Sequence, residues 1–301
     1  TDRKPSASRA ETPLLTLNQK DITRIQITGT SGSEETHPVV LTREGTDWKL
    51  ESGGGYPCQT DKVDALIKLL IDMKSGEPIA ANPANHGALN VADNAFDRKV
   101  EITAGKDIVT LFIGRGGRAS GHVRFAGKNE VLAVRNLQVW SISATASGFI
   151  DTQFVQITPA DVSHITVTNA NGTLDFTRDE TGWRMPDVPA DKIVNAQAVD
   201  DMLNRLSRVS LTVPEGKEVK PEYGLNGTVK VTLQGQTADA PFTVSYAIGA
   251  RVENSYYLKR DDNDFIVSVS TYSVEPAVEK KTADFLNDPP EEGEQIGRAH
   301  V

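Results

Sequence analysis

Two helical patterns with one shared spacing constrain the fold of this 301-residue chain more than any other feature. In each, apolar residues recur at i, i+3, i+4 and i+7, which is typical of a helix with a single buried stripe. The first comprises Val63, Leu66, Ile67, Leu70 and Met73, and the second comprises Val199, Met202, Leu203, Leu206 and Val209. Every position of the second lies 136 residues after its counterpart (199 − 63). The pattern therefore predicts an internal repeat.

The sequence around the two helices repeats as well. Each is preceded by a hairpin turn and a strand with one large aromatic residue, Trp48 in the first copy and Trp183 in the second. Because both copies place a tryptophan on a half-buried strand, core packing is favoured over ligand stacking. Each copy closes with a second helical stretch, predicted over 137–146 and 273–281.

Glycine motifs mark corresponding places after the helices. Gly224-Leu225 in the second copy corresponds to 86–89 (His-Gly-Ala-Leu) in the first, which carries one inserted alanine. Further on, a strand ends at Gly114 and its counterpart at Gly249, and a glycine there suits a turn that needs a positive φ. Alternating strands and a final hairpin follow in both copies.

Hairpin-linked strands with few helices predict the α+β class: two tandem homologous modules, each a mainly antiparallel sheet with helices on one face. We expect a flexible leader over 1–16, modules over 17–155 and 156–288, and a disordered tail over 289–301. The last six residues, 296–301, have no structural logic, and we interpret them as a translated sequencing adapter.

The order of these features, present twice, resembles a bacterial family known as domain of unknown function 4340. The features are the single tryptophan, the amphipathic helix, Gly224-Leu225, and the Ile-Gly pairs that end at Gly114 and Gly249. The resemblance implies a protein tethered to the inner membrane by an N-terminal segment outside this chain, with the rest on the periplasmic side. It also implies association with an ABC-type transport system of the gliding-motility class.

Composition excludes several other classes. The net charge of −9 and the absence of a basic stripe disfavour nucleic-acid binding. Cys58 is the only cysteine, so the chain has neither an intrachain disulfide nor a cysteine-based zinc site. His37, His86, His122 and His164 lack metal-ligand spacing. The cluster Asp261-Asp262-Asn263-Asp264 fails the calcium-loop pattern and is better explained as a hairpin turn.

One loop offers a candidate site for a ligand or partner. It contains Arg115, Arg118 and Ser120 among the four glycines of 114–121, and Arg251 takes the corresponding place in the second copy. Backbone N–H groups and two guanidinium groups could hold a phosphate there. However, the loop has neither phosphate-binding glycine spacing nor a following helix, so a flexible hairpin loop is favoured.

No pair of carboxylates and no nucleophile motif is singled out, so the chain is predicted not to be an enzyme and to need no cofactor. The leading hypothesis is a non-catalytic, membrane-tethered accessory or scaffold protein whose partners are transporter components. The alternative is a glycan- or lipid-binding module of the cell envelope. An enzyme is the third and least favoured interpretation.

Overall fold

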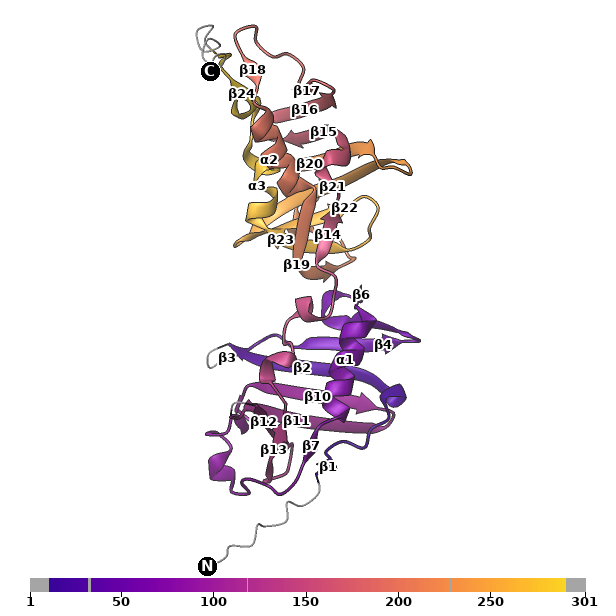
Figure 1. The fold of residues 1–301 in the computed structure, drawn as a ribbon, viewed down its shortest axis with the longest axis vertical. Coiled ribbons are helices and arrows are strands. Elements are labelled where there is room, and N and C mark those ends of the chain that lie inside the picture. Colours follow the sequence, from indigo (N-terminus) through magenta and orange to yellow (C-terminus); the bar gives the residue numbers. More distant parts are fainter. Residues whose placement is uncertain (1–10, 32–33, 118, 228, 291–301) are drawn as a thin grey trace, which may run out of the picture. The chain divides into compact units, whose positions relative to one another are not determined.

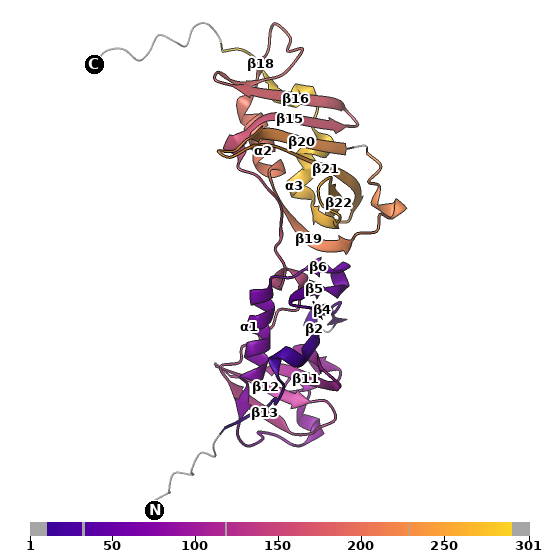
Figure 2. The ribbon, with the colours of Figure 1, turned by 90° about the vertical axis from the view of Figure 1, so that its right-hand side faces the viewer.

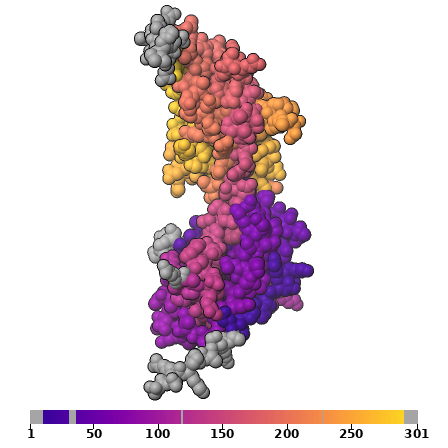
Figure 3. All heavy atoms as spheres, in the orientation of Figure 1, coloured from indigo at the N-terminus to yellow at the C-terminus, as the bar shows by residue number. Residues whose placement is uncertain are grey.

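The computed structural model describes residues 11–31, 34–117, 119–227 and 229–290, and the chain divides into two compact units, Thr1–Asp151 and Thr152–Val301 (Figure 1). Each unit is built on one nine-stranded sheet, and all the strand pairs in the described residues are antiparallel. The predicted α+β class is confirmed at this level. In the space-filling view the first unit takes the indigo-to-magenta part of the colour scale and the second unit the remainder (Figure 3).

The described residues of the first unit form one α-helix, α1 (Thr60–Ile71), and the first thirteen strands. The strands are β1 (Thr12–Pro13), β2 (Ile22–Ser31), β3 (Glu34–Glu35), β4 (Val39–Glu44), β5 (Asp47–Leu50), β6 (Tyr56–Pro57), β7 (Lys74–Ser75), β8 (Val91–Ala92), β9 (Ala95–Phe96), β10 (Arg98–Ala104), β11 (Asp107–Arg115), β12 (Ser120–Phe125) and β13 (Val131–Arg135). Its main sheet has the order β13-β12-β11-β10-β2-β4-β5-β6, with β3 paired to β2.

The second unit contains α2 (Ala196–Leu206), α3 (Thr271–Glu279) and the remaining strands. The strands are β14 (Gln153–Gln156), β15 (Val162–Asn169), β16 (Gly172–Asp179), β17 (Gly182–Arg184), β18 (Ile193–Val194), β19 (Arg208–Gly216), β20 (Val229–Gln236), β21 (Pro241–Val252), β22 (Ser255–Arg260), β23 (Ile266–Ser270) and β24 (Leu286–Asn287). The main sheet has the order β14-β19-β23-β22-β21-β20-β15-β16-β17.

The two sheets share one strand order over most of their width. The run β13-β12-β11-β10-β2-β4-β5 in the first unit matches β23-β22-β21-β20-β15-β16-β17 in the second. Within these runs, neighbouring strands also follow one another closely along the chain, except at the pairs β10-β2 and β20-β15, whose members are far apart in the sequence. β2 and β15, the first strands of these two runs in chain order, therefore lie inside their sheets, each between a strand that precedes the helix and one that follows it.

The predicted helix stripes face the sheets. Val63, Leu66, Ile67 and Leu70 of α1 are buried, as are Val199, Met202, Leu203 and Leu206 of α2. α1 lies across one face of the first sheet (Figures 1 and 2). In the second unit, α2 and α3 pack against each other, and α3 also contacts several strands of its sheet. Burial of these apolar stripes supplies the main stabilising free energy of each helix.

The second helical stretch forms in only one unit. α3 corresponds to the stretch predicted over 273–281, whereas the helix predicted over 137–146 is wrong: two 3-10 turns, Val139–Ser141 and Ala146–Gly148, stand there instead. Between them, the Ser143 hydroxyl accepts a hydrogen bond from the Thr145 backbone N–H and lies 3.2 Å from the Thr145 hydroxyl. Such local side-chain bonds compete with helical ones, and the β-branched residues around them add to the cost.

Both units begin earlier than the sequence indicated. β1 pairs with β7, and Leu15 is only 5% exposed, although 1–16 was predicted to be a flexible leader. Likewise, β14 pairs with β19 of the second unit, so the division falls after Asp151 rather than after residue 155. Each of these short strands pairs with the strand that follows the helix, a partner that periodicity does not reveal. The leader residues 1–10 and the tail 291–301, including 296–301, lie outside the described residues.

A second, smaller core lies on the other face of the first sheet. Here the segment 76–97 packs over β11 to β13, and Val91, Phe96, Phe112 and Val131 are buried together. Arg124 of β12 is 2% exposed and holds this segment. Its Nε donates to the Val91 carbonyl at 2.6 Å and its Nη1 to the Lys128 carbonyl at 3.0 Å. Its guanidinium also pairs with Asp93 and lies over the Phe112 ring.

Candidate functional site

A groove runs beside the helix in each unit, between the helix and the segment that closes the unit. We call them the first and second helix grooves; their volumes are about 370 Å³ and 220 Å³. The first is lined by Lys62, Ala65, Leu66, Leu69, Ser141, Ser143, Gly148 and Phe149. The second is lined by Ala198, Asp201, Met202, Arg205, Pro276, Lys280, Asp284 and Phe285.

The two helix grooves use the same helical positions. The four α2 residues of the second groove each lie 136 residues after the four α1 residues of the first (198 − 62). The closing segments match as well, because Phe149 and Phe285 are also 136 apart and both are buried. The grooves are therefore equivalent places of the two units with different side chains.

The first helix groove is mainly apolar. Leu66 and Phe149 are buried at its floor and Leu69 is half-buried. A neighbouring hollow of about 240 Å³ shares Leu69 and continues along α1 to Met73. Lys62 is its one charged lining residue, exposed and without an ion-pair partner in the described part of the chain. This groove suits apolar side chains of a bound segment.

The second helix groove is charged. Arg205 replaces Leu69 at the equivalent position; its guanidinium lies 3.2 Å from Glu275, 4.2 Å from the Tyr272 ring centre, and bonds the Tyr272 carbonyl. Asp284 accepts a hydrogen bond from the Lys281 backbone N–H at 2.9 Å. This groove therefore presents charges that other groups of the same unit already hold in place.

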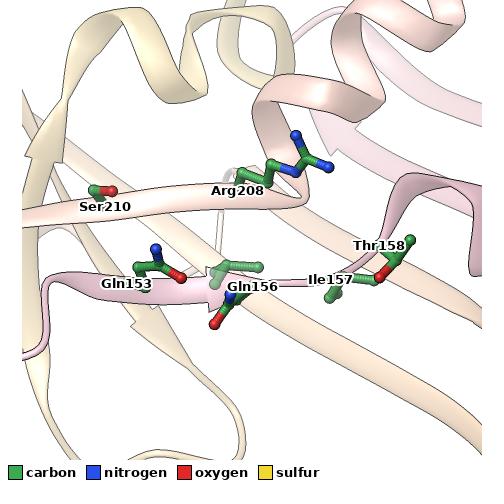
Figure 4. A pocket seen from close by; sticks show the side chains of 7 residues that line it. Gln153, Gln156, Ile157, Thr158, Arg208 and Ser210 are labelled. Carbon is green, nitrogen blue, oxygen red and sulfur yellow. The ribbon is translucent and has the colours of Figure 1, made fainter.

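A third hollow, which we call the β14–β19 groove, is polar. Its volume is about 530 Å³, and it is lined by Gln153, Val155, Gln156, Ile157, Thr158, Arg208 and Ser210. Figure 4 shows Gln153 and Gln156 on β14 beside Arg208 and Ser210 on β19. In the strand register, Gln156 stands opposite Arg208 and Gln153 opposite Ser210. Val155 and Val209 are buried and anchor the two strands to the unit.

The loop 114–121, which the sequence offered as a candidate site for a ligand or partner, contributes no lining residue to these grooves. Arg115 ends β11, and its backbone N–H donates to Asp97 at 2.7 Å. Ser120 begins β12, and its carbonyl accepts from the Gly116 backbone N–H. Arg118 lies outside the described residues. Arg251 is exposed near the end of β21, where its Nε donates to the Glu253 carbonyl at 3.1 Å.

Gly114 and Gly249 have a different role from the predicted one. Neither has a positive φ, and both lie within strands, so the prediction of a turn is wrong. A Cβ at Gly114 would lie 2.1 Å from the Leu89 carbonyl oxygen, and a Cβ at Gly249 would lie 2.0 Å from that of Tyr223. Glycine is required because the backbone of a loop crosses the strand at that point.

This crossing also corrects the match between the Gly-Leu motifs. Gly224 has φ 59° and ends the 3-10 turn Pro221–Tyr223 in the left-handed conformation. In the first unit the left-handed residue is Asn90, with φ 54°, and not Gly87. Asn90 follows Leu89, whose carbonyl lies against Gly114, just as Gly224 follows Tyr223, whose carbonyl lies against Gly249. The pair Leu89-Asn90 therefore occupies the same place in the first unit as Tyr223-Gly224 does in the second. Leu225, half-buried, lies beside Gly249.

Trp48 and Trp183 are 1% and 8% exposed, which places them in the cores rather than in a ligand site. An arginine lies over each ring: Arg43 at 5.6 Å from the Trp48 ring centre and Arg178 at 4.2 Å from that of Trp183. Each arginine also bonds a carbonyl of the 3-10 turn that opens its unit. Each arginine therefore links the 3-10 turn before β2 or β15 to the tryptophan of the same unit.

The described residues contain no group of three or more histidine, cysteine, aspartate or glutamate side chains placed to hold a metal ion. The acidic turn is occupied by ion pairs: Asp261 with Lys230, Asp262 with Arg260, and Asp264 with Lys217. Hydrogen bonds from Arg260 lower the pKa of Asp262. These aspartates therefore brace the β22–β23 hairpin.

Burial raises the pKa of the Cys58 thiol to about 11, against the smaller opposing effect of Lys49. The thiolate is the reactive form, so at pH 8 we expect maleimide labelling roughly 100-fold slower than for a thiol with an ordinary pKa of 9.0. The rate should rise about tenfold per pH unit below the thiol pKa. The urea-unfolded chain, whose thiol is exposed, is the control. Equal rates for the folded and unfolded chain would contradict this assignment.

The sequence did not single out the groove residues. The repeat itself held a signal for the helix grooves. At aligned positions of the two buried helix stripes both copies have apolar residues, whereas the aligned pair Leu69 and Arg205, beside the stripes, differs in charge. For the β14–β19 groove no sequence signal existed, because its residues come together only when β14 pairs with β19.

Comparison with known families gives one match. The family described as a domain of unknown function (DUF4340) matches residues 48–226, more than half of the chain. No curated protein and no solved structure matches the chain. In the described part of the chain, helices of the length and apolar character needed to cross a bilayer are absent.

Proposed function

This chain belongs to the DUF4340 family of domains of unknown function, and on that premise we propose that it is a non-catalytic accessory or scaffold protein. In this proposal it is tethered to the inner membrane, lies on the periplasmic side, and binds components of an ABC-type transport system of the gliding-motility class. The family resemblance set out above supports the transport association, and the grooves support a binding role.

We infer further that the two units are tandem copies of one module. The inference is supported by the common strand order, by the equivalent crossings at Gly114 and Gly249, and by helix grooves at the same helical positions. Three independent features of the fold then have one explanation.

The observation that carries the scaffold role is the different lining of equivalent grooves. A duplicated module needs only its core to fold, so groove residues can change without loss of stability. The first helix groove has Ala65 and Leu69 where the second has Asp201 and Arg205. One chain thus offers an apolar and a charged binding place, which suits an adaptor that holds two unlike partner segments.

Site-specific photo-crosslinking in the native bacterium tests this role. A benzophenone amino acid at Ala65, on the exposed side of α1, should crosslink to a permease or substrate-binding subunit of an ABC transporter, identified by mass spectrometry. The same probe at Ile108, exposed on the β10–β11 hairpin away from the groove, is the matched control. The proposal fails if Ala65 yields no transporter subunit, or if Ile108 crosslinks to the same subunit equally well.

A second proposed function is a glycan- or lipid-binding module of the cell envelope. The observation that favours it is the β14–β19 groove, whose polar side chains are two amides, two hydroxyls and one guanidinium, beside Val155 and Ile157. Groups of these kinds bind sugars and anionic head groups through hydrogen bonds.

A further inference from the structure

Arg208 differs from the other described arginines of the second unit. Arg178, Arg184, Arg205 and Arg260 each pair with a carboxylate, and Arg251 bonds a carbonyl. Arg208 is exposed in the β14–β19 groove and has no such partner among the described residues. In a chain with 41 acidic and 32 basic residues, a guanidinium without a carboxylate beside it is available to an external anion.

The surroundings of Arg208 add neutral hydrogen-bonding groups. Gln156 stands opposite it on β14, and the hydroxyls of Thr158 and Ser210 also line the groove. No carboxylate is among the lining residues, so nothing in the groove opposes a bound anion. Amide and hydroxyl groups both donate and accept, and hydroxyl groups of a ligand can satisfy both roles.

Hydrogen bonds hold the two strands under these groups in place, and the space between them is sufficient for a small ligand. The two strands are held by a hydrogen bond from the Leu211 backbone N–H to the Thr152 carbonyl and by one from Ile157 to Ser207, each 2.8 Å. On the other side, Arg260 Nη1 donates to the Phe154 carbonyl at 2.6 Å. A volume of about 530 Å³ lies within the range of roughly 300–1,000 Å³ for small-molecule sites.

We propose that the β14–β19 groove binds a small polyol that carries one oxyanion, a phosphate or a carboxylate, with the oxyanion on Arg208. The hydroxyls of the ligand contact Gln156, Thr158 and Ser210. This inference deepens the second proposed function and is independent of the scaffold role, whose test uses a different groove. The ligand chemistry is shared by free sugar acids and phosphates and by the head group of an anionic lipid.

Titration of the whole chain tests the proposal. Glycerol 3-phosphate and glucuronate are the soluble probes, followed by calorimetry and by NMR shifts of the glutamine side-chain amides of the groove. We expect saturable binding that weakens with rising salt, since it depends on one cation. Arg208→Gln should weaken binding at least tenfold, and Arg208→Lys less, because lysine keeps the charge but loses the two-pronged donor geometry.

Arg251→Gln, which removes an exposed arginine of the same unit outside the groove, is the matched control and should bind as the wild type does. Because Arg208 is exposed and pairs with no carboxylate among the described residues, its variants should melt at the wild-type temperature. Vesicles containing phosphatidylglycerol, against phosphatidylcholine alone, distinguish the sources. Arg208-dependent vesicle binding assigns a lipid head group, and Arg208-dependent binding of soluble probes alone assigns a free ligand. Absence of saturable binding in both arms overturns the proposal, as does equal binding by Arg208→Gln or equal loss in Arg251→Gln.

Discussion

Substituting Gly114 by alanine is expected to destabilise the first unit by at least about 2 kcal/mol. The added Cβ would lie 2.1 Å from the Leu89 carbonyl oxygen and 2.7 Å from that of Asn90. These are backbone atoms, so they cannot rotate away as a side chain could, and either the strand or the loop must move. Urea unfolding followed by tryptophan fluorescence measures the change.

Gly87→Ala is the matched control in the same loop. No atom lies within 4 Å of a Cβ there, and the backbone does not have a positive φ. This substitution should therefore be neutral or slightly stabilising, since it reduces the entropy of the unfolded chain. Equal effects of Gly87→Ala and Gly114→Ala would show that the close crossing does not exist. Gly249→Ala should repeat the Gly114 result in the second unit.

Replacing Arg124 by methionine is expected to cost the first unit about 3 kcal/mol. The methionine fills much of the space but leaves the Val91 and Lys128 carbonyls without their donor. The contact with the Phe112 ring loses its charge as well. Thermal or urea unfolding measures the loss, and exposure of the segment 76–97 should appear as faster proteolysis there.

The second unit suggests the variant that should partly rescue this loss. Lys259 lies 135 residues after Arg124, and its Nζ donates to the Asn263 carbonyl, four residues further on, as Arg124 does to Lys128. Arg124→Lys should therefore cost only about 1–2 kcal/mol. Asp93→Ala should cost less than about 1 kcal/mol, since the carboxylate is 78% exposed. A larger effect for Asp93→Ala than for Arg124→Met would overturn this assignment.

What the sequence predicts well is local. The stripes of α1 and α2 follow the 3.6-residue period, and the strands with Trp48 and Trp183 follow hairpin signals, so their burial could be read from spacing alone. The helical stretch predicted over 273–281 also forms, as α3, although Pro276 lies within it. Such signals depend on neighbours within a few residues, which the sequence displays directly.

What the sequence misses depends on distant contacts. β14 is an edge strand of four residues whose partner, β19, begins about fifty residues later. Gly114 is a glycine because of Leu89, which no pattern links to it. The false helix at 137–146 shows the opposite error, since apolar spacing was present and local hydroxyl bonds prevailed over it. The β14–β19 groove was missed for the same reason as β14, because it forms only when two segments distant in the sequence pair with each other.

The crossing at Gly114 also determines where the chain can accept insertions. The crossing fixes Leu89 and Asn90 against β11. The segment that leads from β7 to Leu89 is longer than the corresponding segment of the second unit, which leads from β19 to Tyr223. Length can therefore change upstream of the crossing while the sheet below keeps its register. An evolving protein of this architecture can acquire new surface at that loop, and relatives should differ most in length there.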